Sequence, residues 1–359
     1  MSVALLGFGA VLILAFMRMP LGIALGLVGV IGFGELANYK AAISSAARLV
    51  IDSGQSYGLS VVPLFILMGL MVERGGMARE LYRAAYVFLG HRKGGLAMST
   101  IVACGMFSAI CGSSLATAAT MSKVSMPEMR RYKYNDSLAT ASIAAGGTLG
   151  ILIPPSVILV IYGLMTETSV GKLFIAGVLP GLVGVLFYLL AVVVVVTRNP
   201  AAGPAGERSN WGERLLALRD VWTTLGLFIF VIGGIYVGAF TPTEAAGMGA
   251  AGAMLIAWRR GALSVASAME VLRETAVTSA KLFVLLFGAL IFSNFVTPPI
   301  SAAVTVPEPA KVIFKISVPV PPVSVSALVK SVSVVTLTVI APEAASAFME
   351  SVPVSKVIV

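Results

Sequence analysis

Two short stretches of the chain combine residue types that could bind a small ion or an anion without a charged side chain. The first is Gly112-Ser113-Ser114, which lies within an uncharged run, residues 96–122, that also holds Thr117. The second runs from Gly146 to Ser156 and contains three glycines and two prolines. An interrupted helix exposes carbonyl oxygens that suit sodium and N-terminal amides that suit a carboxylate. We therefore predict two discontinuous segments that form one site.

The residues of these segments have two predicted roles. The candidate sodium ligands are Gly112, Ser113, Ser114, Gly146 and Gly147. The candidate solute-binding residues are Ser113, Ser114, Thr117, Thr148 and Pro154. Small residues and hydroxyls also pack helices together in membranes, so packing is the alternative role for each serine. Two interrupted segments in one chain favour a binding site over packing.

Catalysis is not expected from the remaining reactive residues. Cys104 and Cys111 lie in one apolar run, and the single histidine, His91, lies outside it, which argues against a disulfide scaffold or a Cys/His metal centre. Activation of Cys111 or Ser113 as a nucleophile would need a nearby base, and the run contains no lysine or carboxylate. We therefore predict neither an enzyme nor a bound cofactor.

Two polar residues are expected to start helices. Thr241-Pro242-Thr243-Glu244 has the pattern of a capping box, so we interpret Glu244 as structural. Asp136 is predicted to cap a helix that begins at Ser137.

The elements that position these residues must lie in a membrane. Of 359 residues, 58% are hydrophobic and 11% are charged, whereas soluble domains have about a quarter charged residues. Uncharged runs reach the roughly 20 residues that span a bilayer: Ser53–Val72, Leu96–Ser122, Ser137–Thr166, Leu173–Thr197 and Val221–Phe240. The net charge of +9 is spread over short connections, which argues against nucleic acid as a partner. The predicted fold is an all-α, polytopic helical membrane protein embedded in the lipid bilayer.

The basic connections predict a re-entrant hairpin. The connections 73–93 and 123–133 carry five and four Lys or Arg residues, so both should be cytoplasmic. Only residues 96–122 separate them, so this run should enter the membrane and return, with its tip at Gly112-Ser113-Ser114. The stretches Ala37–Ile51 and Met77–Leu89 mix charged and apolar residues at helical spacing and are predicted to lie along the membrane interface.

The last segment differs from the rest in composition. Residues 297–359 contain no glycine and nine of the 18 prolines, although 37 glycines precede them. We hypothesise a frameshifted or corrupted C-terminus; a genuine disordered or weakly β-prone tail is the alternative. The expected divisions are 1–93 (membrane and interfacial helices), 94–172 (hairpin and discontinuous helix), 173–296 (further membrane helices) and 297–359 (the anomalous tail).

At these motifs the chain resembles the large membrane subunit of the tripartite ATP-independent periplasmic (TRAP) transporters, the DctM-like family of the ion transporter superfamily. The resemblance rests on residues 106–117, Gly146 through Ser156 and Phe240 through Ala246, and covers approximately residues 1–296. It implies the first part of an inverted-repeat elevator transporter in the bacterial inner membrane. Among the expected divisions, it implies that 1–93 is scaffold-like, that 94–172 is transport-like and that 173–296 starts a second repeat. The second repeat, with its own hairpin, would fall where the tail stands.

The resemblance also implies a function and partners. It implies sodium-coupled import of an organic acid, often a C4-dicarboxylate, together with a small membrane subunit and a periplasmic binding protein. A membrane scaffold or assembly subunit without transport activity of its own is the alternative from another class.

Overall fold

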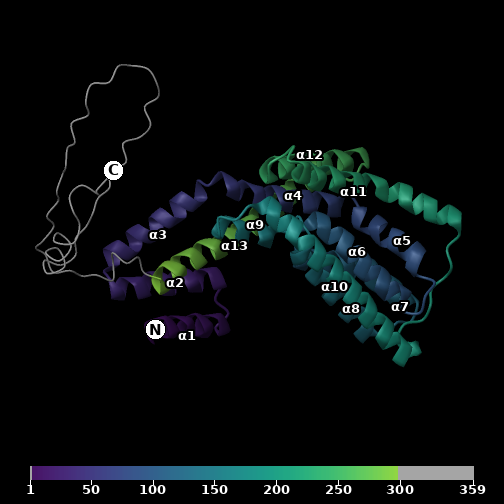
Figure 1. Cartoon of the computed structure of the whole chain (residues 1–359), viewed down its shortest axis with the longest axis horizontal. Coiled ribbons are helices and arrows are strands. Elements are labelled where there is room, and N and C mark those ends of the chain that lie inside the picture. The colour runs from purple at the N-terminus through teal and green to yellow at the C-terminus, as the bar shows by residue number, and fades with distance from the viewer. Residues whose placement is uncertain (1, 298–359) are drawn as a thin grey trace, which may run out of the picture. The chain divides into compact units, whose positions relative to one another are not determined.

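The computed structural model describes residues 2–297, and all regular secondary structure in that range is helical (Figure 1). The first helices are α1 (Ser2–Phe16), α2 (Leu21–Leu36), α3 (Tyr39–Gly54), the 3₁₀ segment η1 (Tyr57–Ser60), α4 (Val61–Arg74), α5 (Met77–Leu89), α6 (Gly95–Cys111) and α7 (Ser114–Arg131). They are followed by α8 (Asp136–Leu152), α9 (Val157–Met165), α10 (Val170–Arg198), η2 (Pro200–Ala202), α11 (Trp211–Val237), α12 (Pro242–Arg259) and α13 (Val265–Val296).

Several of these elements are long and apolar enough to cross a bilayer. The five candidate spans in the described range are Tyr57–Arg74, Asp136–Met165, Val170–Arg198, Trp211–Val237 and Val265–Val296. The prediction of an all-α polytopic membrane protein is therefore confirmed. The predictions for residues 298–359 lie outside the described residues and stay predictions.

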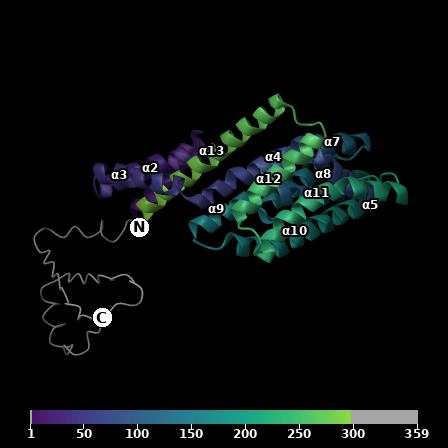
Figure 2. The ribbon, with the colours of Figure 1, turned by 90° about the horizontal axis from the view of Figure 1, so that it is seen from above.

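The helices pack around separate apolar clusters. In one group, α2 packs against α1, α3 and α13, around Phe33, Phe292 and Phe295 (Figures 1 and 2). In the other, α4 to α12 surround two larger clusters that include Phe65, Phe107 and Leu149. Helices α4 and α5 pack with the hairpin helices and with α11 and α12. The predicted divisions of the chain stay predictions.

The two predicted interfacial helices have different surroundings. Both form helices, and α5 has the predicted bounds Met77–Leu89. Helix α3 buries only Ala42 and exposes Ile43 and Ile51, as expected of a helix on a membrane surface. Helix α5 instead packs on α6 and α11, and protein covers its apolar residues. The apolar face of α5 is therefore covered by protein rather than by lipid, because an amphipathic pattern alone does not distinguish the two as the apolar neighbour. The predicted position of α5 along the membrane interface stays a prediction.

The basic connections contact each other. Lys123 of α7 pairs with Glu73 at the end of α4 (3.8 Å), and the hydroxyls of Tyr86 and Tyr132 are 3.1 Å apart. All five ion pairs among the described residues join segments predicted to be cytoplasmic: Arg74–Glu270, Arg83–Asp220, Lys123–Glu73, Arg130–Asp136 and Arg260–Glu80. The connections before and after the predicted hairpin therefore lie side by side.

One predicted cap is confirmed and the other is wrong. Thr241 Oγ1 accepts a hydrogen bond from the Glu244 N–H (3.3 Å), and Glu244 accepts one from the Thr241 N–H (2.8 Å), so the capping box is present. At α8 the cap is Asn135, whose side chain accepts from the Ser137 N–H (2.8 Å). Asp136 is the first residue of α8 and pairs with Arg130 instead, because Asn135 takes the extended backbone conformation that a cap requires.

Candidate functional site

The predicted hairpin turns within two residues. Gly112 ends α6 in the left-handed conformation (φ 62°), and its N–H donates to the Ser108 carbonyl. Glycine adopts this conformation without the steric cost of a side chain. Ser113 is extended and caps α7, where its hydroxyl accepts from the Ala116 N–H at 3.4 Å. The tip therefore lies at Gly112-Ser113, as predicted.

The second interruption is shorter than the sequence predicts and lies further along the chain. Helix α8 continues through Gly146, Gly147 and Gly150 and ends at Leu152, and α9 begins after Ser156. The break therefore covers residues 153–156, and the predicted unwinding at the glycines is wrong. A helix can contain glycine where a neighbouring helix packs too closely for a larger side chain. The two prolines end the helix instead, because they have no N–H to donate.

The prolines leave carbonyl oxygens without helical partners. In a continuous helix the carbonyls of Gly150 and Ile151 would accept from the N–H groups of residues 154 and 155. Both residues are prolines and have no N–H. Gly146 and Gly147 were the predicted source of free carbonyls. The residues four positions before the two prolines, Gly150 and Ile151, are the ones whose carbonyls lose their helical donors.

The hairpin tip and the helix break are in direct contact. The Val157 N–H donates to the Gly112 carbonyl at 3.4 Å. A Cβ on Gly112 would lie 2.5 Å from the Pro155 carbonyl oxygen, and one on Gly150 would lie 2.8 Å from the backbone of Ser113 and Ser114. The predicted pairing of the two interrupted segments is confirmed by these contacts, and backbone approaches backbone at the junction.

The structure places three of the candidate side chains near this junction. Ser113 and Ser114 are half-buried at the tip. Thr117, one turn into α7, is fully buried, and its Oγ1 lies 3.5 Å from Ser108 Oγ. These positions supply hydroxyls beside the junction; their predicted roles as ligands stay predictions.

The other candidates have different positions. Pro154 is buried within the break. Thr148 is exposed and its Oγ1 lies 2.8 Å from the Tyr188 hydroxyl of α10. A Cβ on Gly146 would lie 2.7 Å from the Cys104 sulfur of α6, and one on Gly147 would lie 2.8 Å from Ala118 of α7. Both glycines therefore let α8 approach the two arms of the hairpin closely.

The chemistry available at the junction is that of neutral oxygen atoms. Within residues 2–297 no group of three or more His, Cys, Asp or Glu side chains could hold a metal ion. Helices α7 and α9 both begin here, capped by Ser113 and Ser156, and helix N-termini favour negative charge. The arrangement can offer carbonyl oxygens to a monovalent cation and helix N-termini to an anion.

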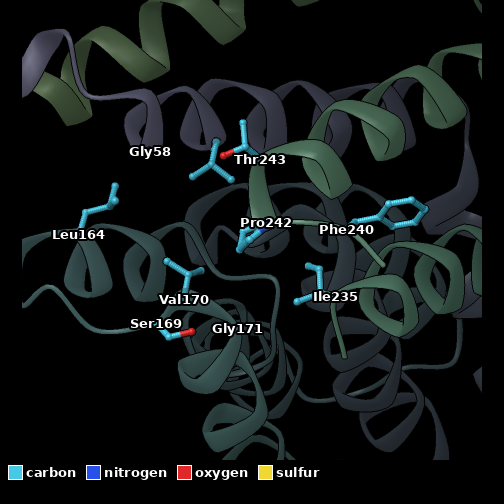
Figure 3. Close-up of a pocket in the computed structure, with 10 residues that line it drawn as sticks. Gly58, Leu164, Ser169, Val170, Gly171, Ile235, Phe240, Pro242 and Thr243 are labelled. Carbon is cyan, nitrogen blue, oxygen red and sulfur yellow. The ribbon is translucent and has the colours of Figure 1, made fainter. Parts of the chain in front are cut away.

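A cavity lies away from this junction. It has a volume of about 360 Å³ and is lined by residues around the start of α10 and the α11–α12 turn, including Leu164, Val170, Ile235 and Phe240 (Figure 3). Its walls are mainly apolar, and its polar side chains are Ser169 and Thr243. None of the candidate ligands lines it, so the cavity and the tip–break junction are separate features.

Comparison with known proteins identifies the family. The model of the family "Tripartite ATP-independent periplasmic transporter, DctM component" matches residues 8–348. The C4-dicarboxylate TRAP transporter large permease protein of Pseudomonas aeruginosa is 38% identical over 258 residues, which is 71% of this chain and 60% of that protein. The ectoine TRAP transporter large permease protein of Halomonas elongata is 34% identical over 276 residues, 76% of this chain and 64% of that protein.

Relatives of this chain are named for different solutes. The sialic acid TRAP transporter large permease protein of Vibrio cholerae is 32% identical over 281 residues, 78% of this chain and 65% of that protein. The match to the Pseudomonas protein covers about 60% of that protein's length. The family match also continues beyond residue 296, into the segment that composition sets apart.

Proposed function

The chain belongs to the DctM component family of the tripartite ATP-independent periplasmic transporters, and from this membership we propose that it serves as a permease subunit coupling uptake of an organic acid to sodium. As a family member with five candidate spans, it is a multi-pass protein of the bacterial inner membrane. The observation that carries the proposal is the contact between the α6–α7 tip and the α8–α9 break.

Sodium binding is supported by the oxygen atoms at this contact. The carbonyls of Gly150 and Ile151 have prolines where helical donors would stand, and the hydroxyls of Ser113 and Ser114 lie on the opposing tip. Unwound carbonyls coordinate sodium in transporters with discontinuous helices. The predicted ligands Gly112, Gly146 and Gly147 are less favourable, because the Gly112 carbonyl accepts from Val157 and the other two carbonyls lie inside α8.

An acidic solute is supported by the helix N-termini. Helices α7 and α9 begin at the junction, and a helix N-terminus carries about half a positive charge. Transporters use such half-helix N-termini to bind substrate carboxylates. Two of the solutes named for the relatives, C4-dicarboxylate and sialic acid, are acids by name. We propose an organic acid, delivered by a periplasmic binding protein and moved together with a small membrane subunit.

Sodium binding can be tested on the purified chain. We expect sodium chloride to raise its thermal unfolding temperature more than choline chloride of equal ionic strength, because a bound ligand stabilises the folded state. Ser113→Ala and Ser114→Ala should each raise the sodium concentration that gives half of this effect. Ser122→Ala is the matched control, because Ser122 lies two turns further along α7 and bonds the Ala119 carbonyl. Equal responses to sodium and choline would contradict the proposal.

The carbonyl ligands need a different substitution. Pro154→Ala and Pro155→Ala would each restore a backbone N–H that can bond the carbonyl of Gly150 or Ile151 and remove it from the site. We expect both variants to lose part of the sodium response while they remain folded. Pro127→Ala, within α7 and away from the tip, should keep the full response. An unchanged sodium response in both break variants would exclude these carbonyls as ligands.

Solute transport can be tested in a fusion that has the full length of a relative, because the match covers about 60% of the Pseudomonas permease. Residues 1–296 can be joined to the remaining part of the Pseudomonas permease and reconstituted in proteoliposomes with its small subunit and binding protein. We expect sodium-dependent uptake, with weaker sodium dependence in the serine variants. A sodium response of the purified chain without any uptake by the fusion would favour the scaffold or assembly role.

A further inference from the structure

The loop between α10 and α11 fastens the end of the hairpin through backbone hydrogen bonds. The Gly94 N–H donates to the Gly203 carbonyl (2.8 Å), and the Gly206 N–H donates to the Gly90 carbonyl (2.9 Å). The Asn135 N–H donates to the Ala202 carbonyl (3.0 Å). Ala202 and Gly203 are buried. These bonds tie the α5–α6, α7–α8 and α10–α11 connections into one surface.

The three connections are rich in cations. Residues 90–94, 130–136 and 198–208 hold seven Lys or Arg residues and two acidic residues, Asp136 and Glu207. Arg130 pairs with Asp136. The other six cations are exposed and form no ion pair within residues 2–297; we call them the basic patch: Arg92, Lys93, Arg131, Lys133, Arg198 and Arg208. An excess of unpaired cations on one surface favours an anionic partner.

The position of the patch at the ends of apolar helices favours contact with lipid headgroups. Its cations flank the ends of apolar helices, because α6 begins at Gly95, α8 begins at Asp136 and the 29-residue span α10 ends at Arg198. Tyrosines lie at the same level: the Tyr86 and Tyr132 hydroxyls are 3.1 Å apart, and Tyr134 accepts from the Leu96 N–H. Tyrosine is enriched where membrane spans meet water.

We propose that the basic patch binds the phosphate groups of anionic phospholipids in the adjacent leaflet. A soluble polyanion is less favoured, because the cations surround the ends of membrane helices rather than a surface that projects into water. The patch differs from an ordinary excess of basic residues in cytoplasmic loops. The folded backbone brings together cations from three connections that lie far apart in the sequence. Each cation near an anionic lipid surface contributes about fivefold to affinity.

The test is lipid binding by the purified full chain in a neutral detergent. The probe is fluorescent phosphatidylglycerol, followed by anisotropy and displaced by unlabelled competitors. We expect unlabelled phosphatidylglycerol to displace it, and phosphatidylcholine or glycerol phosphate at equal concentration to have little effect. Binding should weaken as salt is added. Displacement by glycerol phosphate or by polyglutamate as effective as that by the lipid would overturn the proposal.

A matched pair of variants separates the patch from overall charge. The triple variant Lys93→Gln, Lys133→Gln, Arg208→Gln removes one cation from each connection of the patch. The control, Lys40→Gln, Arg48→Gln, Lys172→Gln, removes the same residue types from segments predicted to face the other side. We expect the patch variant to bind the lipid at least tenfold more weakly and the control to bind it as the unmodified chain does. Equal losses in both would contradict a specific site.

A variant that keeps every charge tests the role of the loop. A Cβ on Gly206 would lie 2.9 Å from the Gly90 carbonyl oxygen, so Gly206→Val should release the loop while retaining all six cations. We expect weaker lipid binding from this variant. If the triple patch variant does not fold, the single variants Lys133→Gln and Lys172→Gln provide the same comparison. We expect Lys133→Gln to weaken lipid binding about fivefold and Lys172→Gln to leave it unchanged. Unchanged binding in Lys133→Gln and in Gly206→Val would overturn the proposal.

Discussion

At the scale of single residues, the candidate site depends on glycines, which have no Cβ, and on prolines, which have no backbone N–H. Gly112 turns the chain because it has no Cβ, and Gly150 lets the hairpin tip reach the backbone of α8. Pro154 and Pro155 have no N–H, so the carbonyls of Gly150 and Ile151 lack their helical donors. These features use main-chain atoms, which explains how a site can form in a chain with so few intramembrane charges.

The contact at Gly150 gives a prediction about stability. A methyl group there would lie 2.8 Å from the Ser113 carbonyl carbon and the Ser114 nitrogen, and a packed backbone cannot move aside easily. We expect Gly150→Ala to destabilise the protein by about 1 to 3 kcal/mol, measured by thermal unfolding in detergent. Gly226→Ala in α11 is the control, because a Cβ there meets no atom within 4 Å. It should be neutral or stabilise the helix by up to about 1 kcal/mol. The same cost at both positions would contradict the close approach.

At the scale of elements, much of the hairpin could be predicted from charge. The connections 73–93 and 123–133 are both basic with one apolar run between them, and the structure brings them into contact. The extent of the break could not be predicted, because glycine marks either an unwound segment or a close helix contact. In α8 it marks contacts with Cys104 and Ala118. Only the positions of neighbouring helices distinguish these two meanings.

Amphipathic helices and helix caps also show that contacts between residues distant in the sequence are hard to predict. The pattern of α5 gives its bounds correctly, yet its apolar neighbours come from α6 and α11, which follow it in the sequence. The capping box of α12 was predictable because its partners lie three residues apart. The choice between Asn135 and Asp136 at α8 was not, since both are good caps and the ion pair of Asp136 with Arg130 depends on the α7–α8 turn.

The hairpin gives a prediction about membrane sidedness. Lys123 pairs with Glu73 at the end of α4, and Arg92 directly precedes α6. Both positions belong to connections that are predicted to be cytoplasmic. In a variant without Cys104 and Cys111, single cysteines at positions 92 and 123 should react with an impermeant maleimide from the cytoplasmic side. A cysteine at position 172 is the control and should react from the other side. Reaction of positions 92 and 123 from opposite sides would exclude a re-entrant hairpin.

The capping box gives a prediction about pH. The Thr241 N–H donates to the Glu244 carboxylate and holds the pKa of this exposed group below its usual value. A lowered folded-state pKa stabilises the protein above the ordinary glutamate pKa of about 4.3, and this contribution is lost as pH falls through the folded-state value. Thermal unfolding of the unmodified chain and of Glu244→Gln should therefore differ most at neutral pH, and the difference should shrink as the pH falls below the ordinary glutamate pKa. A difference that grows with acid would contradict this role.

At the scale of the whole described unit, close glycine contacts join α2 to α13. A Cβ on Gly288 would overlap the carbonyl oxygen of Gly22, and one on Gly29 would lie 2.9 Å from the backbone of Ile291 and Phe292. Small residues let membrane helices approach so that dispersion forces act over their length. Helix α13 also contacts α4, so it links the group of α1 to α3 with the larger group that holds the tip and the break.

This packing predicts a specific cross-link. The Asn294 amide donates to the Ser45 hydroxyl at 2.7 Å, which brings α13 and α3 together beside the glycine contacts. In a background without Cys104 and Cys111, Ser45→Cys with Asn294→Cys should form a disulfide under mild oxidation, seen as a mobility shift on a denaturing gel. Adding Gly288→Ala should lower the yield strongly, because the new methyl group pushes α2 and its neighbour α3 away from α13. Gly9→Ala, whose Cβ meets no atom within 4 Å, should leave the yield unchanged. If Gly288→Ala cross-links as readily as Gly9→Ala, the glycine contact does not hold these helices together.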